Sequence, residues 1–148
     1  MSNPQSQIPN SQLQEGHSFS DDRGKVTFNN DFNAAEIKRL YFIENNDTTF
    51  VRGWHGHQIE KRWFVAVTGS FKISVINLDD FNNPSHDLKP QRYKIYTDNF
   101  PILHVPPGNI TSIQALEAHS KLMVMSDYLM GEIQDEYRFS IDYFKNTP

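Results

Sequence analysis

The chain has 148 residues, of which 37% are hydrophobic and 13% aromatic, enough for one domain with a core rich in Phe, Tyr, Val and Ile. A net charge of −4 argues against a broad nucleic-acid-binding surface, and the absence of cysteine excludes disulfides, thiolate metal sites and a cysteine nucleophile. No apolar stretch approaches the ~20 residues that span a bilayer, so we expect a cytoplasmic protein that binds neither membrane nor nucleic acid.

The N-terminal segment is rich in Ser, Asn, Gln and Pro and shows no hydrophobic periodicity. We interpret residues 1–16 as an arm that is disordered or crosses onto a partner subunit. Residues 17–148 then form a single domain.

Short apolar runs separated by turn signals follow along the chain. The predicted strands are residues 25–28, 37–44, 51–57, 63–68, 71–77, 93–96, 102–105, 110–115 and 121–128. Gly69-Ser70, between two of these runs, indicates a hairpin. Short helices are expected near residues 33–36 and in the tail over residues 133–144. Many short strands without alternating helices are typical of an antiparallel sandwich or barrel, so the fold class is all-β.

The most informative segment is Arg52-Gly53-Trp54-His55-Gly56-His57, inside one predicted strand. Because strand side chains alternate, His55 and His57 point to the same face. Imidazole titrates near neutral pH, so this pair can move a proton or bind a metal ion. A purely structural pair is the alternative, although inward-facing polar side chains are costly unless they are hydrogen-bonded.

Several ordered motifs resemble known families. Gly53, His55-x-His57, Glu60 and Gly69 resemble a first cupin motif, and Val105-Pro106-Pro107-Gly108 resembles the second. Four further segments are similar, in family order, to the nucleotide-sugar 3,5-epimerases and 3,4-ketoisomerases: Asp22-Arg23-Gly24, Ile37-Lys38-Arg39-Leu40-Tyr41, Arg52-Gly53-x-His55-x-His57 and Ser126-Asp127-Tyr128. The resemblance implies a cupin-type double-stranded β-helix, a jelly-roll barrel with short helical segments.

Metal-binding cupins resemble one another in using two histidines and a glutamate from the first motif and a histidine from the second. Here the last position is Thr111, and Glu60 lies closer to the histidine pair than that pattern expects. His104 and His119 stand at other positions. We therefore expect no metal and no cofactor.

The resemblance also implies an isomerase that acts on a nucleotide-linked 4-keto-6-deoxyhexose, in deoxysugar biosynthesis for a surface polysaccharide such as lipopolysaccharide. A base removes the proton at C3, and a cation or hydrogen-bond donor stabilises the negative charge that develops on the C4 oxygen. Returning a proton to C3 gives an epimer, whereas returning it to C4 gives a 3-keto sugar. The expected reaction is C3 epimerisation or the closely related 3,4-ketoisomerisation.

Four residues carry the chemistry in this interpretation. His55 occupies the family position of the catalytic base, and His57 matches the second histidine of the ketoisomerases. Tyr41 or Tyr128 could donate a proton, although both could equally be core or interface aromatics. The catalytic tyrosine of the 3,5-epimerases falls one residue later, at Leu129, so double epimerisation is not expected.

Three arginines are candidates for substrate binding. Arg23 and Arg52 could hold the diphosphate, because planar guanidinium pairs with it bidentately. Arg62 lies where the epimerases place an enolate-stabilising lysine, which a fixed guanidinium fork replaces only in part. The simpler interpretations are a turn-closing ion pair for Arg23, an edge charge for Arg52 and a solvated charge run for Arg62.

Some questions stay open at the level of sequence. Asp127 and Asp142 are both candidates for a carboxylate that orients His55. The nucleotide could be dTDP, CDP, GDP or UDP. A metal-dependent cupin enzyme and a non-catalytic sugar-binding cupin are the alternative functions. A homodimer is expected, because the small cupins that this chain resembles usually pair through their sheets.

Overall fold

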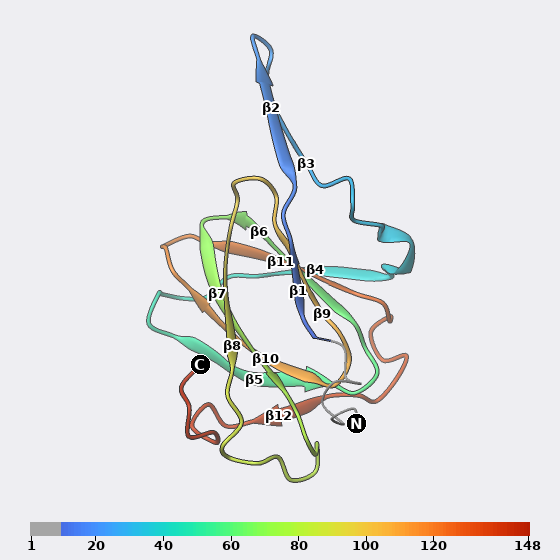
Figure 1. Ribbon diagram of the computed structural model, residues 1–148, viewed down its shortest axis with the longest axis vertical. Helices are drawn as coiled ribbons and strands as arrows, with labels where there is room; N and C mark the ends of the chain where they lie inside the picture. Colours follow the sequence, from blue (N-terminus) through green and yellow to red (C-terminus); the bar gives the residue numbers. More distant parts are fainter. Residues whose placement is uncertain (1–9) are drawn as a thin grey trace, which may run out of the picture.

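The computed structural model describes residues 10–148, and within this range two five-stranded antiparallel sheets face each other (Figure 1). The first sheet has the order β1-β9-β6-β11-β4, the second has the order β12-β5-β10-β7-β8, and β2 pairs with β3 in a separate hairpin. The elements are β1 (Gln12–Gln14), β2 (His17–Asp21), β3 (Gly24–Phe28), η2 (Ala34–Glu36), β4 (Arg39–Ile43), β5 (Val51–His57), β6 (Arg62–Thr68), β7 (Ser70–Asn77), β8 (Gln91–Tyr96), β9 (Ile102–Val105), β10 (Asn109–Ala115), β11 (Lys121–Ser126) and β12 (Tyr137–Phe139).

The predicted all-β class is confirmed, and each predicted strand is present. Sequence inspection missed β1, β2 and β12, because these short segments lack an apolar pattern and gain their order from pairing with a neighbouring strand. The short helix expected near residues 33–36 is the 3-10 turn η2.

The helix predicted over residues 133–144 is wrong. This tail contains β12, which pairs antiparallel with the free edge of β5, and its remaining residues form turns. The aromatic side chains of Tyr137, Phe139 and Phe144 pack on Trp54 and its neighbours, on the outer face of the second sheet. Pairing with β12 satisfies the backbone groups along the open edge of β5 while it buries these rings, whereas a helix in this place would leave that edge unpaired.

The hairpin predicted at Gly69-Ser70 is also wrong. β6 pairs with β9 and β11 in the first sheet, whereas β7 pairs with β8 and β10 in the second. Gly69 is therefore the corner at which the chain passes from one sheet to the other. It has a φ of +70°, and a Cβ built there would lie 2.0 Å from the Ser120 Oγ, so both the conformation and the space require glycine.

The main core lies between the sheets and contains side chains from both inner faces, among them Phe64, Leu122 and Val124 from the first sheet and Phe71 and Ile73 from the second. Toward one end of the barrel these apolar rows give way to polar ones. There Arg62 pairs with Ser126 in the first sheet, and His55 pairs with Thr111 in the second. The polar ends of the two inner faces form the candidate site.

Part of the predicted N-terminal arm lies outside the described residues, since these begin at residue 10. The end of the arm, Gln12–Gln14, forms β1 and pairs with β9 at the edge of the first sheet. The hairpin of β2 and β3 then projects away from the two sheets (Figure 1). No helix among residues 10–148 is long and apolar enough to cross a bilayer.

Candidate active site

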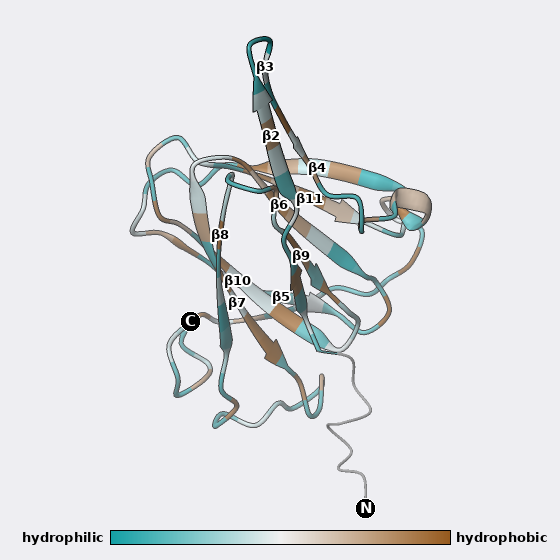
Figure 2. Ribbon diagram, turned by 45° about the horizontal axis from the view of Figure 1, so that its top comes forward, coloured by the Kyte–Doolittle hydropathy of each residue, from teal (hydrophilic) through white to brown (hydrophobic). Residues whose placement is uncertain are grey.

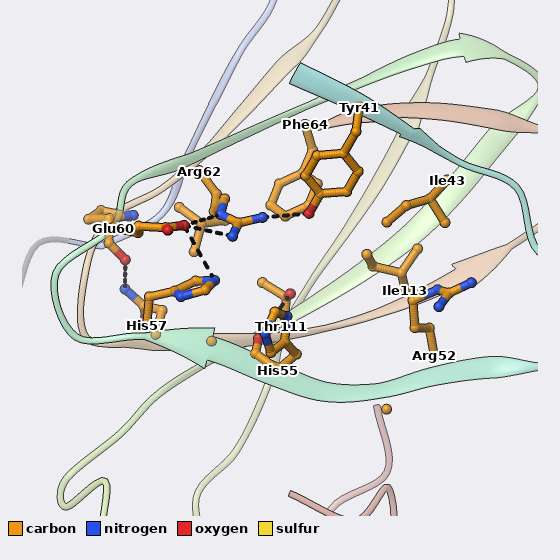
Figure 3. A pocket seen from close by; sticks show the side chains of 15 residues that line it. Tyr41, Ile43, Arg52, His55, His57, Glu60, Arg62, Phe64, Thr111 and Ile113 are labelled. Atoms are coloured by element: carbon orange, nitrogen blue, oxygen red, sulfur yellow. Dashed lines mark hydrogen bonds and ion pairs between the residues drawn. The ribbon is translucent and has the colours of Figure 1, made fainter. Parts of the chain in front are cut away.

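The predicted histidine pair lines a pocket at the polar end of the barrel (Figure 3). His55 and His57 extend from β5, while Tyr41 from β4 and Arg62 from β6 face them from the other sheet. The inner cavity holds about 50 Å³, and it adjoins an outer cavity of about 450 Å³ at the mouth. Together they are large enough for part of a small organic ligand.

A β-bulge places Arg52 in this pocket. Opposite β10 the register of β5 shifts, so that Thr111 pairs with His55 but Ile113 pairs with Arg52. Simple alternation would send Arg52 to the face opposite His55, and the extra residue in the strand returns it to the same face. Arg52 consequently lines both cavities, close to the histidines.

His55 is placed to accept a proton. Its side chain is 27% exposed, and its Nε2 atom is buried without a hydrogen-bond partner among residues 10–148. Burial is the main cause that lowers the pKa of His55 from 6.5 to about 4, and the neighbouring His57 ring and the Arg138 cation lower it further. The ring is therefore neutral at neutral pH. The carboxylate of Glu136 lies 3.8 Å from Nε2, where it would stabilise the imidazolium once a proton has been taken up.

His57 is held more tightly, and only 5% of it is exposed. Its Nδ1 lies 2.6 Å from the backbone oxygen of Asp135. A carbonyl oxygen only accepts hydrogen bonds, so Nδ1 carries the proton and Nε2 has the free lone pair. Burial and the Arg62 cation lower the pKa of His57. The two imidazole rings meet edge to face, with 4.9 Å between their centroids.

A buried ion pair forms the opposite wall. Arg62 donates to the Glu60 Oε2 from Nη2 at 2.6 Å and from Nε at 2.8 Å. Its Nη1 donates to the hydroxyl of Tyr41 at 2.5 Å, and the Ser126 hydroxyl also donates to Glu60 Oε2. Since Arg62 donates to the Tyr41 oxygen, the phenolic proton of Tyr41 is left available for the pocket.

These residues do not fit a metal ion. Glu60, the carboxylate of the first motif, already binds the Arg62 guanidinium through two hydrogen bonds. Thr111, which stands at the second-motif position, places its hydroxyl 3.4 Å from the backbone oxygen of His55. Within residues 10–148, no three His, Cys, Asp or Glu side chains are grouped as a metal site.

The mouth of the pocket is lined by three further cations. Arg39, Arg52 and Arg138 surround the outer cavity together with Glu136. The Arg39 guanidinium lies over the ring of Tyr41, 4.7 Å from its centroid, which holds it beside the opening. In a protein whose net charge is −4, this concentration of arginine favours an anionic ligand.

Two predicted site residues lie elsewhere in this chain. Arg23 is at the tip of the projecting hairpin, where it pairs with Asp21 at 2.6 Å and its side chain is 87% exposed. Tyr128 follows β11 and lies beneath the Lys38 amine, but it lines neither cavity of the site. The structure therefore brings together His55, His57, Tyr41, Arg52 and Arg62.

The candidate partners of His55 are replaced by a residue that sequence inspection missed. Asp127 accepts from the backbone N–H of Lys61, and Asp142 accepts from the Ser140 hydroxyl, so neither contacts the ring. The nearest carboxylate is that of Glu136, which directly precedes β12 and lies 3.8 Å from the His55 Nε2, and Arg138 of β12 is the residue paired with His55 in the sheet. The alternation of Glu136, Tyr137 and Arg138 is the only sequence signal that could have indicated them.

His104 and His119 also lie away from the pair. His104 stacks on Trp63, with Nδ1 3.1 Å from the backbone oxygen of Arg62, and burial lowers its pKa. His119 lies in a turn at a φ of +61°. Neither residue lines the cavities next to His55.

Comparison with protein families found one that matches nearly the whole chain. The family model described as FdtA (WxcM-like, C-terminal) matches residues 9–147. Comparison with curated protein sequences gave no match.

Solved structures share the fold. The QdtA 3,4-ketoisomerase from Thermoanaerobacterium thermosaccharolyticum, a histidine-to-asparagine variant in complex with TDP-4-keto-6-deoxyglucose, has 20% identity and a TM-score of 0.68 over 93% of this chain and 94% of that one. The WlaRB TDP-quinovose 3,4-ketoisomerase from Campylobacter jejuni has 20% identity and a TM-score of 0.65 over 94% and 100%.

The dTDP-4-dehydrorhamnose 3,5-epimerase from Bacillus anthracis, with TDP and pyrophosphate bound, has 19% identity and a TM-score of 0.68 over 84% of this chain and 76% of that one. These likenesses confirm the predicted cupin-type fold.

Proposed function

Because the chain belongs to the family described as FdtA (WxcM-like, C-terminal), we propose that it is a deoxysugar-pathway isomerase that removes the C3 proton of a nucleotide-linked 4-keto-6-deoxyhexose. The observation that carries this proposal is the neutral His55–His57 pair, which faces Arg62 and Tyr41 across one cavity. Two of the similar structures contain TDP or a TDP-sugar, which supports a dTDP-linked substrate among the possible nucleotides.

In the proposed mechanism His55 is the base. Its Nε2 accepts the C3 proton, the C3–H bonding electrons form a C3–C4 double bond, and the negative charge moves to the C4 oxygen. Glu136, 3.8 Å from this nitrogen, stabilises the imidazolium that results. Tyr41 and Arg62, on the opposite wall, are the donors that stabilise the oxyanion.

In this proposal the arginines at the mouth of the pocket bind the diphosphate of the substrate. Arg52 keeps the role predicted from the sequence, and Arg39 and Arg138 join it around the outer cavity. The outer cavity adjoins the inner one, so a diphosphate held there would leave the sugar beside His55. Guanidinium groups suit this ligand, because they pair with phosphate oxygens bidentately.

The favoured outcome is 3,4-ketoisomerisation, in which the proton of the C3 hydroxyl passes to the C4 oxyanion and a proton returns to C4, so that C3 becomes the ketone and C4 carries a hydroxyl. Family membership and the second histidine support it. C3 epimerisation is the second candidate, because Tyr41 faces His55 from the other sheet and could return a proton to the opposite face of C3.

The test is proton NMR in deuterated water with dTDP-4-keto-6-deoxyglucose and a chelator. We expect the wild type to exchange the C3 proton and His55→Asn to lose this exchange by at least about 100-fold, within the range of general-base catalysis. His86→Asn, a change at an exposed histidine outside the site, is the matched control. Product couplings distinguish a 3-keto sugar from an epimer.

Failure of the wild type to exchange the C3 proton with any common nucleotide would overturn the proposal and favour a sugar-binding cupin. Exchange at the wild-type rate in His55→Asn would show that His55 is not the base, while the proposed reaction itself would still be supported.

A further inference from the structure

Asp135 is a buried carboxylate next to the site that the mechanism above does not use. It lies in the segment before β12 and is 3% exposed. Its Oδ1 accepts from the backbone N–H of Gln58 at 2.9 Å, and its Oδ2 accepts from those of Ile59 and Glu60, both at 2.8 Å. One side chain thereby binds three of the four amides in the segment that joins β5 to β6.

The same residue orients the second histidine. The backbone oxygen of Asp135 accepts from Nδ1 of His57 at 2.6 Å, and its carboxylate Oδ2 lies 3.9 Å from that nitrogen. The ring is thus held as the Nδ1–H tautomer, and its free Nε2 lies 3.7 Å from Glu60 Oε2. The backbone of Glu60 is itself bound by the Asp135 carboxylate. The surroundings of both ring nitrogens of His57 therefore depend on Asp135.

We propose that Asp135 is a positioning residue of the isomerase site, fixing the tautomer of His57 and its alignment with the Glu60–Arg62 pair. The expected effect of Asp135 on the reaction rests on the proposed function. Its effect on the tautomer and orientation of the His57 ring does not depend on that function. With Asp135 in place, Nε2 of His57 is held as a proton acceptor toward the cavity. Without it, the turn loses three hydrogen bonds and Glu60 is free to move.

The alternative is a carboxylate that only stabilises a turn. Asp47 provides the matched comparison, since its Oδ1 accepts from the backbone N–H of Thr49 at 3.0 Å and of Phe50 at 2.7 Å, in the turn before β5. It lines a different pocket and contacts no residue of the site. Asp47→Asn therefore changes a turn-binding carboxylate without touching a histidine.

The first experiment is nitrogen-15 NMR of the histidine rings without substrate, with His57 assigned through His57→Gln. We expect the Nδ1–H tautomer in the wild type and in Asp47→Asn. In Asp135→Asn an NH2 group replaces one acceptor oxygen of the turn amides, so residue 135 and its backbone oxygen should shift away from His57 and a mixture of tautomers should result. Slow hydrogen exchange at the amides of residues 58–60 is expected in the wild type. An Nε2–H tautomer, or unprotected amides, in the wild type would overturn the inference even if Asp135→Asn does not fold.

The second experiment is steady-state kinetics of the C3 proton exchange. We expect Asp135→Asn to lower kcat about 10- to 100-fold with little change in KM, because small misalignments of catalytic groups cost rates of this order. Asp47→Asn should keep the wild-type kcat. A wild-type kcat in a folded Asp135→Asn would overturn the catalytic role of Asp135, whereas an inactive wild type would overturn the proposed function instead.

Discussion

At the scale of single residues, two ion pairs in this chain share a distance and differ in burial. Arg62 and Glu60 lie 2.6 Å apart with side chains 8% and 9% exposed, and Arg23 and Asp21 lie equally close on the open hairpin. Water solvates the exposed pair in the folded and unfolded states alike, whereas the buried pair has lost this solvation. The two pairs should therefore respond differently to the loss of one charge.

We expect Glu60→Gln to lower the free energy of unfolding by about 3 kcal/mol, because it leaves the Arg62 cation buried without its counter-charge. Asp21→Asn, the matched control, should have a much smaller effect. Urea denaturation of both variants measures the difference. Equal losses would show that Glu60 and Arg62 are not paired as described.

The pKa of His55 predicts how stability depends on pH. This pKa falls from 6.5 to about 4 on folding, so between these values the unfolded chain binds more protons than the folded one. Stability contributed by the neutral ring is therefore complete above pH 6.5 and is lost as the pH falls toward 4. In His55→Asn the Tm should decrease less over this interval than in the wild type. Parallel Tm curves would contradict the lowered pKa.

At the scale of secondary-structure elements, the corner between β6 and β7 depends on one glycine. Gly69 and Gly131 have similar φ values, +70° and +78°, but only Gly69 is crowded, since nothing lies within 4 Å of a Cβ built at Gly131. Comparing alanine substitutions at the two glycines therefore separates the free-energy cost of the left-handed conformation from the cost of a steric clash.

We expect Gly131→Ala to cost about 1 kcal/mol of unfolding free energy, which is the conformational penalty alone. Gly69→Ala should cost at least about 2 kcal/mol, because the added methyl group must displace Ser120 and strain the corner. Thermal or urea denaturation compares the two variants. Similar losses in both would mean that the corner has room for a side chain.

At the scale of the whole molecule, the first sheet is apolar on its outer face as well as its inner one. Trp63, Val65 and Met125 form a second cluster there, covered in part by Phe32 and Ile37. In the same rows, edge strand β4 exposes Leu40 (55%) and Phe42 (54%). Figure 2 shows hydrophobic colour along β4. A sheet with two apolar faces requires a cover on each.

We propose that a second copy of the chain covers this face, which agrees with the homodimer expected from the sequence. Light scattering after gel filtration should give twice the monomer mass for the wild type and the monomer mass for Phe42→Lys. Ile141→Lys, at an exposed apolar position on the C-terminal tail, should remain dimeric. A monomeric wild type would contradict the proposal.

The sequence by itself determined nine of the strands, the all-β class, the family and the histidine pair, because these depend on local periodicity and on motifs within a few residues. Strand alternation alone aligned His55 with His57. Only the tertiary structure decided which distant groups complete the site: Glu136 and Asp135 reach the histidines through the pairing of β12 with β5. It also turned Arg52 inward through a bulge and separated β6 from β7. Contacts between residues 75 or more positions apart depend on sheet pairing and shared burial, which no local pattern encodes.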